Sequence, residues 1–261
     1  MEREITSGTG KIRNMKLICT DAGNTLIKVA LMEDSVIRSV ASFPLSDSGL
    51  LAYLSSLSRA DACILSSVSV VNHEVIDILS QKSAHFMELT HKTPVPINNL
   101  YKTPETLGND RLAAVVGAYG LFPGRDVLVI DAGTALTIDF IDRAGNYRGG
   151  NISPGLNMRF RALHDDTQKL FLQSQTDDFE MIGNTTASAI TSGVQNGIIF
   201  EINHYINHFV KQFPDLVTVL TGGDVNFFVN KIEKCTFAEP NLVFFGLMKI
   251  IEFNTQVKII R

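Results

Sequence analysis

Long apolar runs, clustered cysteines and basic stretches are all missing from this sequence. The longest apolar segment, residues 242–253, contains a lysine and a glutamate, so it is not one of the roughly 20-residue apolar spans that cross membranes. The three cysteines lie far apart without metal-ligand spacing, which favours buried free thiols. Lysine and arginine are scattered, and the net charge is −4. We therefore expect a cytoplasmic protein without a membrane or nucleic-acid partner.

The length of the chain allows one large domain or two of ordinary size. It has 261 residues, of which 45% are hydrophobic, and this is ample for a core. Residues 1–14 are polar, and Met15 stands directly before the first apolar segment. We expect residues 1–14 to be a disordered N-terminal extension or the product of a misplaced start.

The segment from Asp21 to Lys28 carries the strongest local signal. It lies between an apolar segment at 16–20 and an alternating one at 26–32, a pattern that predicts strand, tight turn and strand. Gly23 would let the backbone approach a ligand closely, because it has no Cβ atom. The neighbouring carboxylate, amide, hydroxyl and ammonium groups are those that hold a metal-bound polyphosphate: Asp21, Asn24, Thr25 and Lys28.

A second Asp-x-Gly turn begins at Asp131. It follows an apolar segment at 127–130 and precedes an alternating one at 135–141. One such turn is weak evidence, but two copies between predicted strands indicate a structural duplication with a cleft between its halves. In the first half we predict three strands followed by alternating helix and strand, the order of a ribonuclease-H-like fold. We therefore predict an α/β protein of two ribonuclease-H-like domains with mixed sheets flanked by helices, residues 15–122 and 123–261.

Asp110 and Arg111 stand at the start of a predicted helix of small apolar residues, 112–118. An aspartate in the first turn often caps a helix. A cap, however, requires neither Gly108 before it nor Arg111 beside it. The sequence leaves two interpretations open, a helix cap and a site for an anionic substrate that carries a hydroxyl group.

Three further segments give weaker signals. The glycine-rich run 149–155 either brings backbone N–H groups to the cleft or simply joins a strand to a helix. The Thr-Gly-Gly-Asp turn at 221–224 ends a predicted strand and would let the backbone lie against a flat ligand such as adenosine. Thr186 begins a long helix with apolar residues at i+4 spacing, where a threonine either caps the helix or offers its hydroxyl to a substrate.

Five motifs, taken in order, resemble those of type III pantothenate kinases. This family belongs to the superfamily of acetate kinase, sugar kinases, actin and heat-shock chaperone ATPases. The motifs are Asp-x-Gly-Asn-Thr-x-x-Lys (21–28), Pro-x-x-x-Gly-x-Asp-Arg (104–111), Asp-x-Gly-Thr-Ala-x-Thr-x-Asp (131–139), Gly-Gly-x-Ile-x-Pro-Gly (149–155) and Thr-Gly-Gly-Asp (221–224). The resemblance covers about residues 16–255.

The resemblance implies that ATP binds between the two domains and that its γ-phosphoryl group passes to pantothenate, which gives 4′-phosphopantothenate for coenzyme A biosynthesis. It makes Asp110 the catalytic base, Asp21 the Mg²⁺ ligand and Asp131 the ligand of K⁺ or NH₄⁺. The implied ATP- and phosphate-binding residues are Asp21, Gly23, Asn24, Thr25, Lys28 and Thr134. The implied pantothenate-binding residues are Tyr101, Gly108, Asn109 and Arg111, together with Thr186 from the other subunit of a homodimer.

Two other functions remain open on the sequence. A phosphatase of the same superfamily would share the Asp-x-Gly turns but should lack the Gly-x-Asp-Arg helix start. A non-enzymatic, nucleotide-binding transcriptional regulator would be expected to have lost a catalytic carboxylate. Asp21, Asp110 and Asp131 are all present, so the kinase is the favoured function.

Overall fold

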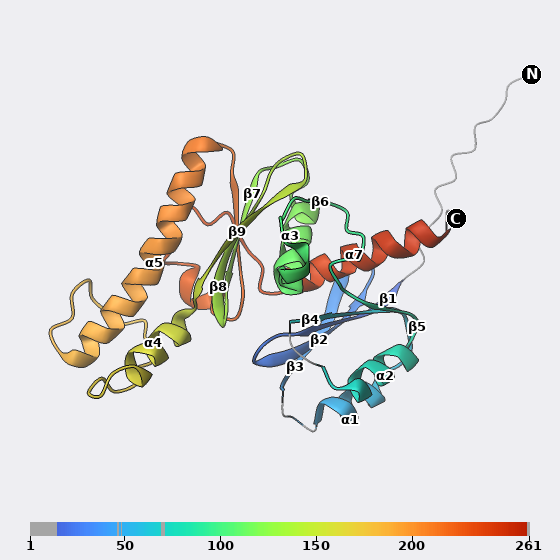
Figure 1. Ribbon diagram of the computed structural model, residues 1–261, viewed down its shortest axis with the longest axis horizontal. Helices are drawn as coiled ribbons and strands as arrows, with labels where there is room; N and C mark the ends of the chain where they lie inside the picture. The colour runs from blue at the N-terminus through green and yellow to red at the C-terminus, as the bar shows by residue number, and fades with distance from the viewer. Residues whose placement is uncertain (1–14, 46, 48, 69–70, 260–261) are drawn as a thin grey trace, which may run out of the picture.

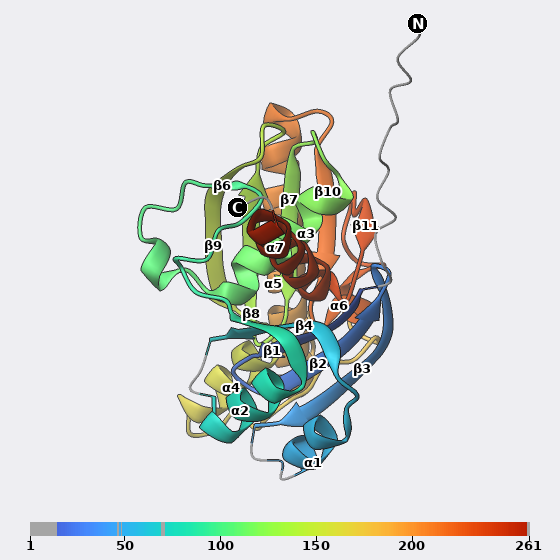
Figure 2. The same ribbon diagram turned by 90° about the vertical axis from the view of Figure 1, so that its right-hand side faces the viewer.

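Two mixed β-sheets, each flanked by helices, organise the chain (Figures 1 and 2). The structure is a computed structural model and describes residues 15–45, 47, 49–68 and 71–259. The extension expected at residues 1–14 lies outside these ranges. Among the described residues, no helix is both long and apolar enough to cross a membrane.

The first sheet has the strand order β3-β2-β1-β4-β5. Its first three strands form an antiparallel meander, and β4 and β5 follow in parallel to β1. Helices α1 and α2 pack on its outer face, where an apolar cluster includes Leu54 and Leu79. The elements are β1 (Lys16–Ala22), β2 (Leu26–Glu33), β3 (Val36–Pro44), α1 (Gly49–Ser56), β4 (Ala60–Ser67), α2 (His73–Gln81) and β5 (Ser83–Glu88).

The second sheet repeats this plan, with the order β11-β10-β7-β8-β9-β6. An antiparallel meander is again followed by two strands parallel to its first strand. The order of the first sheet recurs as β9-β8-β7-β10-β11, with β6 added at the edge beside β9, so the predicted duplication and the predicted α/β class are confirmed. The strands are β6 (Asn98–Asn99), β7 (Val127–Ala132), β8 (Ala135–Ile141), β9 (Asn146–Pro154), β10 (Val217–Thr221) and β11 (Phe237–Ala238).

Helices α3 and α7 lie between the two sheets, while α4 and α5 cover the outer face of the second sheet (Figure 1). One apolar cluster joins strands of both sheets to α3 and α7, and it includes Leu17, Leu247 and Val129. The remaining helices are α3 (Asn109–Leu121), α4 (Leu156–Asp165), α5 (Thr186–Gln212), α6 (Val225–Phe228), α7 (Leu242–Ile259) and the 3₁₀ turn η1 (Pro104–Thr106).

Two segments lie across the domain boundary predicted between residues 122 and 123. Strand β6, at Asn98–Asn99, pairs with β9 of the second sheet. Helix α7, near the C-terminus, contacts β1 and β4 of the first sheet as well as α3. The core between the sheets is therefore built from both halves of the chain, although the halves share one topology.

Glycines allow α3 and α7 to cross with their backbones in contact. A Cβ atom on Gly117 would lie 2.5 Å from the carbonyl oxygen of Leu242. A Cβ atom on Gly246 would overlap the carbonyl group of Ala113. Helices that approach this closely need residues without side chains at the crossing. The relative placement of the two sheets therefore depends on backbone-to-backbone contact at this point.

We predict that Gly246→Ala lowers the free energy of unfolding by about 1–3 kcal/mol, because the new methyl group forces α3 and α7 apart. Urea denaturation followed by circular dichroism would measure the change. Gly197→Ala in α5 is the matched control, because a Cβ atom there meets nothing within 4 Å. It should be neutral or stabilise the protein by about 0.5–1 kcal/mol. Equal effects of the two substitutions would contradict the role of the crossing.

Candidate active site

The two Asp-x-Gly turns face each other across a cleft. A backbone hydrogen bond closes each turn: the Gly23 N–H donates to the carbonyl of Leu26, three residues on, and the Gly133 N–H donates to that of Ala135, two residues on. The hydroxyl oxygens of Thr25 and Thr134 lie 3.2 Å apart. The predicted pair of turns around a cleft is therefore present in the structure.

Two cavities open along this cleft. One, of about 320 Å³, is lined by both turns, by Asp21, Lys28 and Asp131, and by the glycine turn at 221–224. The other, of about 800 Å³, is lined by Tyr101 and by the segment 105–111 at the start of α3. Asp110 lines both cavities. A carboxylate thus stands at the junction between a site with the features of a phosphate-binding cleft and a second, larger site.

Three carboxylates at this junction have raised pKa values. Burial, followed by the charge of Asp110, raises the pKa of Asp21 to about 6, against a hydrogen bond from Ser66 and the charge of Lys28. Burial and the charges of Asp110 and Asp21 raise the pKa of Asp131 to about 7. Burial also raises the pKa of Asp110. Such a cluster of like charges favours a bound cation.

The carboxylates do not by themselves form a complete metal site. Within the described residues, no group of three or more histidine, cysteine, aspartate or glutamate side chains is arranged to hold a metal ion. Mg²⁺ commonly keeps several waters and binds through one or two carboxylates together with substrate phosphates. The donor set here fits a Mg²⁺ ion that would be held jointly by Asp21 and a polyphosphate.

The start of α3 places Asp110 without using it as the N-cap. The N-cap residue is Gly108, which makes no side-chain cap bond, and the Arg111 N–H donates to Oδ1 of Asp110 over 2.8 Å. A Cβ atom on residue 108 would lie 2.5 Å from that same oxygen. Gly108 is therefore needed for the close approach of the Asp110 carboxylate. The bond to the Arg111 N–H uses only Oδ1 of Asp110, so a capping role does not account for Oδ2.

Arg111 is buried and tied to the second sheet. Its Nε and Nη2 donate to the two carboxylate oxygens of Asp139, at 3.1 and 2.6 Å, and its guanidinium carbon lies 5.6 Å from the centre of the Tyr101 ring. The Tyr147 hydroxyl donates to Asp139 over 2.7 Å, and the Tyr147 ring stacks on that of Tyr101. Asp139 accepts from two of the five N–H donors of arginine, and the Tyr101 side chain is a further hydrogen-bond partner of Arg111.

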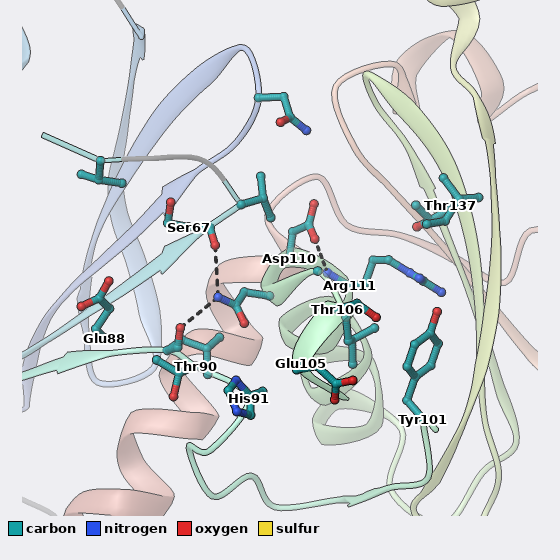
Figure 3. A pocket seen from close by; sticks show the side chains of 18 of the residues that line it. Ser67, Glu88, Thr90, His91, Tyr101, Glu105, Thr106, Asp110, Arg111 and Thr137 are labelled. Atoms are coloured by element: carbon teal, nitrogen blue, oxygen red, sulfur yellow. Dashed lines mark hydrogen bonds between the residues drawn. The ribbon is translucent and has the colours of Figure 1, made fainter. Parts of the chain in front are cut away.

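Asn109 is tied to the first sheet. Its side-chain nitrogen donates to the carbonyl oxygens of Ser67, over 3.1 Å, and Leu89, over 2.9 Å. Figure 3 shows these bonds on one side of Asp110, and it shows Arg111, Tyr101 and Thr137 on the other side. The amide nitrogen of a residue predicted to bind substrate thus holds α3 against the ends of β4 and β5.

The structure brings together every predicted site residue except one. Those that line the two cavities are Asp21, Gly23, Asn24, Thr25, Lys28, Tyr101, Gly108, Asn109, Asp110, Arg111, Asp131 and Thr134. Thr186 is exposed at the start of α5, next to the N-cap Thr185, and lines neither of these cavities. Sequence reasoning missed Asp139, although it ends the motif at 131–139, and it missed Tyr147, Asn157 and Arg161, for which no motif gave a signal.

Residues 17–208 match the sequence pattern of the family described as type III pantothenate kinase. The chain belongs to this family. A type III pantothenate kinase of Phocaeicola vulgatus is 44% identical over 237 residues, which cover 91% of this chain and 98% of that protein.

Solved structures support the fold of this family member. A Campylobacter jejuni protein described as a Baf family transcriptional activator is 24% identical, with a TM-score of 0.60 over 92% of this chain and 99% of its own. A glucokinase from an Antarctic psychrotroph is 9% identical, with a TM-score of 0.51 over 92% of this chain and 100% of its own. At these identities the likeness shows the fold alone, which this chain shares with both proteins.

We predict that Asp131→Asn stabilises the ligand-free protein at pH 8 by about 1–3 kcal/mol. The pKa of Asp131 is raised to about 7, while an unfolded aspartate has a pKa of about 3.9. The folded state therefore binds more protons between these values, and stability falls as the pH rises through 7. Asparagine has no charge to bury, so the variant should lose less stability than the parent between pH 5 and pH 8.

Urea denaturation at pH 5 and pH 8 would measure this difference, with no nucleotide present. Asp178→Asn serves as the control, because Asp178 is exposed on the loop before α5. If Asp131→Asn is no more stable than the parent at pH 8, the carboxylate cluster does not strain the folded state.

Proposed function

We propose that this chain transfers the γ-phosphoryl group of ATP to the primary hydroxyl of pantothenate and forms 4′-phosphopantothenate, the first step of coenzyme A biosynthesis. The observation that carries the proposal is the position of Asp110, which lines both the phosphate-type cleft and the larger cavity. A phosphoryl acceptor and donor must meet in line. A carboxylate at the junction of two cavities is suited to orient the acceptor hydroxyl.

The smaller cavity is the proposed ATP site. Backbone and side-chain groups of Gly23, Asn24 and Thr25, with Lys28, would hold phosphates from the first sheet, and Thr134 would hold them from the second. Gly222 has a positive φ of 100° and packs against the carbonyl of Ala132, which supports a place for the adenosine against this turn. Asp21 would hold Mg²⁺, directly or through water. Bound there, Mg²⁺ would neutralise charge on the phosphates.

Asp110 would act as the base. Its Oδ1 accepts the Arg111 N–H, so Oδ2 is the oxygen that would accept the proton of the pantothenate hydroxyl. Phosphoryl transfer passes through a loose transition state, so positioning and charge neutralisation contribute more than deprotonation. General-base assistance still contributes roughly 10²–10⁴-fold to such a rate.

The larger cavity is the proposed pantothenate site. Arg111 retains N–H donors besides those that bond to Asp139 and Tyr101, and these would bind the pantothenate carboxylate. Tyr101, Gly108 and Asn109 would form the walls around the substrate. The centre of the Tyr101 ring lies 5.6 Å from the Arg111 guanidinium carbon, which supports a fixed direction for the remaining donors.

Asp131 would hold K⁺ or NH₄⁺ beside the phosphates. Its raised pKa, caused by burial and two neighbouring carboxylates, supports the need for a further positive charge. The three cysteines are unpaired, which is consistent with the reducing cytoplasm as the proposed location. The phosphatase and regulator alternatives are less well supported, because neither requires a second cavity that meets the phosphate cleft at a carboxylate.

We predict that the purified protein releases ADP from ATP only when pantothenate is added, and that Asp110→Asn lowers this rate by roughly 10²-fold or more. Asparagine fits the same space without the charge, so folding and ATP affinity should be retained. A coupled ADP assay measures the rate, and isothermal titration calorimetry measures ATP binding. A variant rate within a few-fold of the parent rate would exclude Asp110 as the base.

The same assay tests the other parts of the proposal. ADP release without pantothenate would favour a phosphatase, and ATP binding without any turnover would favour a regulator. Run in K⁺, NH₄⁺ and Na⁺ buffers, the assay should give activity in the first two and little in the third. Equal rates in all three would exclude the assignment of Asp131 to a selective monovalent cation.

We further propose that the active unit is a homodimer with a shared site. Large apolar side chains are exposed on β9, the loop before α5 and α5 itself: Ile152 (63%), Phe171 (54%), Met181 (65%), Ile182 (79%) and Phe200 (52%). Ile152 also lines the larger cavity. Exposed apolar side chains gathered on neighbouring elements are typical of an interaction surface. A second copy bound there would bring its Thr186 toward the pantothenate site.

A mixed dimer tests whether the site is shared. We predict that chains with Asp110→Asn and chains with Thr186→Phe are each inactive alone but regain part of the activity after subunit exchange. In the heterodimer, one of the two sites contains both an intact Asp110 and an intact Thr186, so at most about half of its sites are active. Size-exclusion chromatography of differently tagged chains confirms the exchange. No recovery after demonstrated exchange would mean that each chain builds its own site.

A further inference from the structure

Helix α4 begins directly on the second Asp-x-Gly turn. Its N-cap is Gly155, whose N–H donates to the carbonyl of Thr134 over 3.2 Å. A Cβ atom on Gly155 would overlap the carbonyl groups of Gly133 and Thr134. The glycine therefore allows the helix to start in contact with the turn, which fixes the first two turns of α4 next to the proposed ATP site.

One face of α4 lines that site. Asn157 and Arg161 both line the 320 Å³ cavity. Residues at i and i+4 lie on the same face of a helix, separated by about 6 Å along its axis. The cavity thus has a wall from α4 in addition to the two turns, and this wall carries a guanidinium group.

The charges in the cavity leave Arg161 as an available cation. Four aspartates and two basic residues line it: Asp21, Asp110, Asp131, Asp224, Lys28 and Arg161. Lys28 lies close enough to Asp21 and Asp131 to lower the pKa of both, so its charge is partly offset by them. ATP would bring several more negative charges into this cavity.

Arg159, on the same helix, provides a contrast. It pairs with Glu201 of α5 and donates to the Pro154 carbonyl over 2.8 Å, so it joins α4 to its surroundings. Arg161 is exposed and forms no ion pair with the described part of the chain. Its guanidinium is free to bind a ligand in the cavity.

We infer that Arg161 binds the triphosphate chain of the nucleotide from the side of the second domain. This inference rests on the proposed function of the cavity as an ATP site. The planar guanidinium donates two parallel N–H bonds to phosphate oxygens, whereas the nearby carboxylates repel them. Arg161 and Lys28 then contact the phosphates from different elements, α4 and β2. Arg161 thereby favours binding of nucleotides that carry phosphates over binding of the bare nucleoside.

Isothermal titration calorimetry with Mg²⁺-ATP, Mg²⁺-ADP and adenosine tests the inference on Arg161→Gln and Arg161→Lys. Arg161→Gln should weaken ATP binding about 5- to 50-fold, the effect of losing a charge-assisted hydrogen bond. Arg161→Lys should recover part of the loss because it restores the charge. Adenosine affinity should be unchanged in both variants.

Arg125→Gln is the matched control. Arg125 precedes β7, whereas Asp131 lies near the end of this strand, so the control lies about 20 Å from the phosphate turn. It should leave ATP affinity unchanged even if loss of the Arg125 bond to the Asp215 carbonyl lowers stability, and both Arg161 variants should have the unfolding midpoint of the parent. An unchanged ATP affinity in Arg161→Gln would overturn the inference. An equal loss for adenosine and ATP would also overturn it, because the contact would then be with the nucleoside. A parent that does not bind ATP would instead overturn the proposed function.

Discussion

Mutual repulsion among three carboxylates is the constraint on which the site depends. Asp21 and Asp131 stand at equivalent positions near the ends of β1 and β7, and Asp110 stands at the start of α3. Burial raises the pKa of all three, and the charge of Asp110 further raises the pKa of Asp21 and of Asp131. Such an arrangement lowers the stability of the ligand-free protein, so the rest of the fold must hold it in place. Cations and metal-bound phosphates relieve the same repulsion, which links ligand binding to stability.

The fold fixes Asp110 through its two neighbours in the sequence. Asn109 binds carbonyl groups at the ends of the first sheet, and Arg111 binds Asp139 of the second sheet. Further along α3, Gly117 contacts the backbone of α7. The carboxylate between Asn109 and Arg111 is therefore positioned by both halves of the duplicated structure. A buried ion pair such as Arg111–Asp139 adds little net stability, so its value lies in this placement.

The sequence predicts features that depend on residues close together in the chain, but not contacts between residues far apart in the chain. The two turns were predictable because alternating apolar residues and an Asp-x-Gly segment are local signals. The duplication followed from the repetition of this turn. The place of Asp110 at the start of a helix followed from the small apolar residues after it. The partners Asp139 and Tyr147 were not predictable, because Asp139 reaches Arg111 through the packing of α3 on β8 and Tyr147 reaches Asp139 through the pairing of β8 with β9. The same holds for the crossing at Gly246, since a helical glycine has no local signal for what it will contact.

The larger cavity links the chemistry to the surface. Its lining runs from Asp110 to Ile152, and the Ile152 side chain is among the most exposed apolar groups of the described residues. A kinase must keep water away from the phosphoryl group, or ATP is hydrolysed instead. One chain supplies the proposed base and the proposed phosphate-binding groups but leaves this side of the cavity beside an exposed apolar surface. In the proposed dimer, the second chain would cover that surface and enclose the acceptor site at the same time. Association would therefore complete the site as well as stabilise the fold.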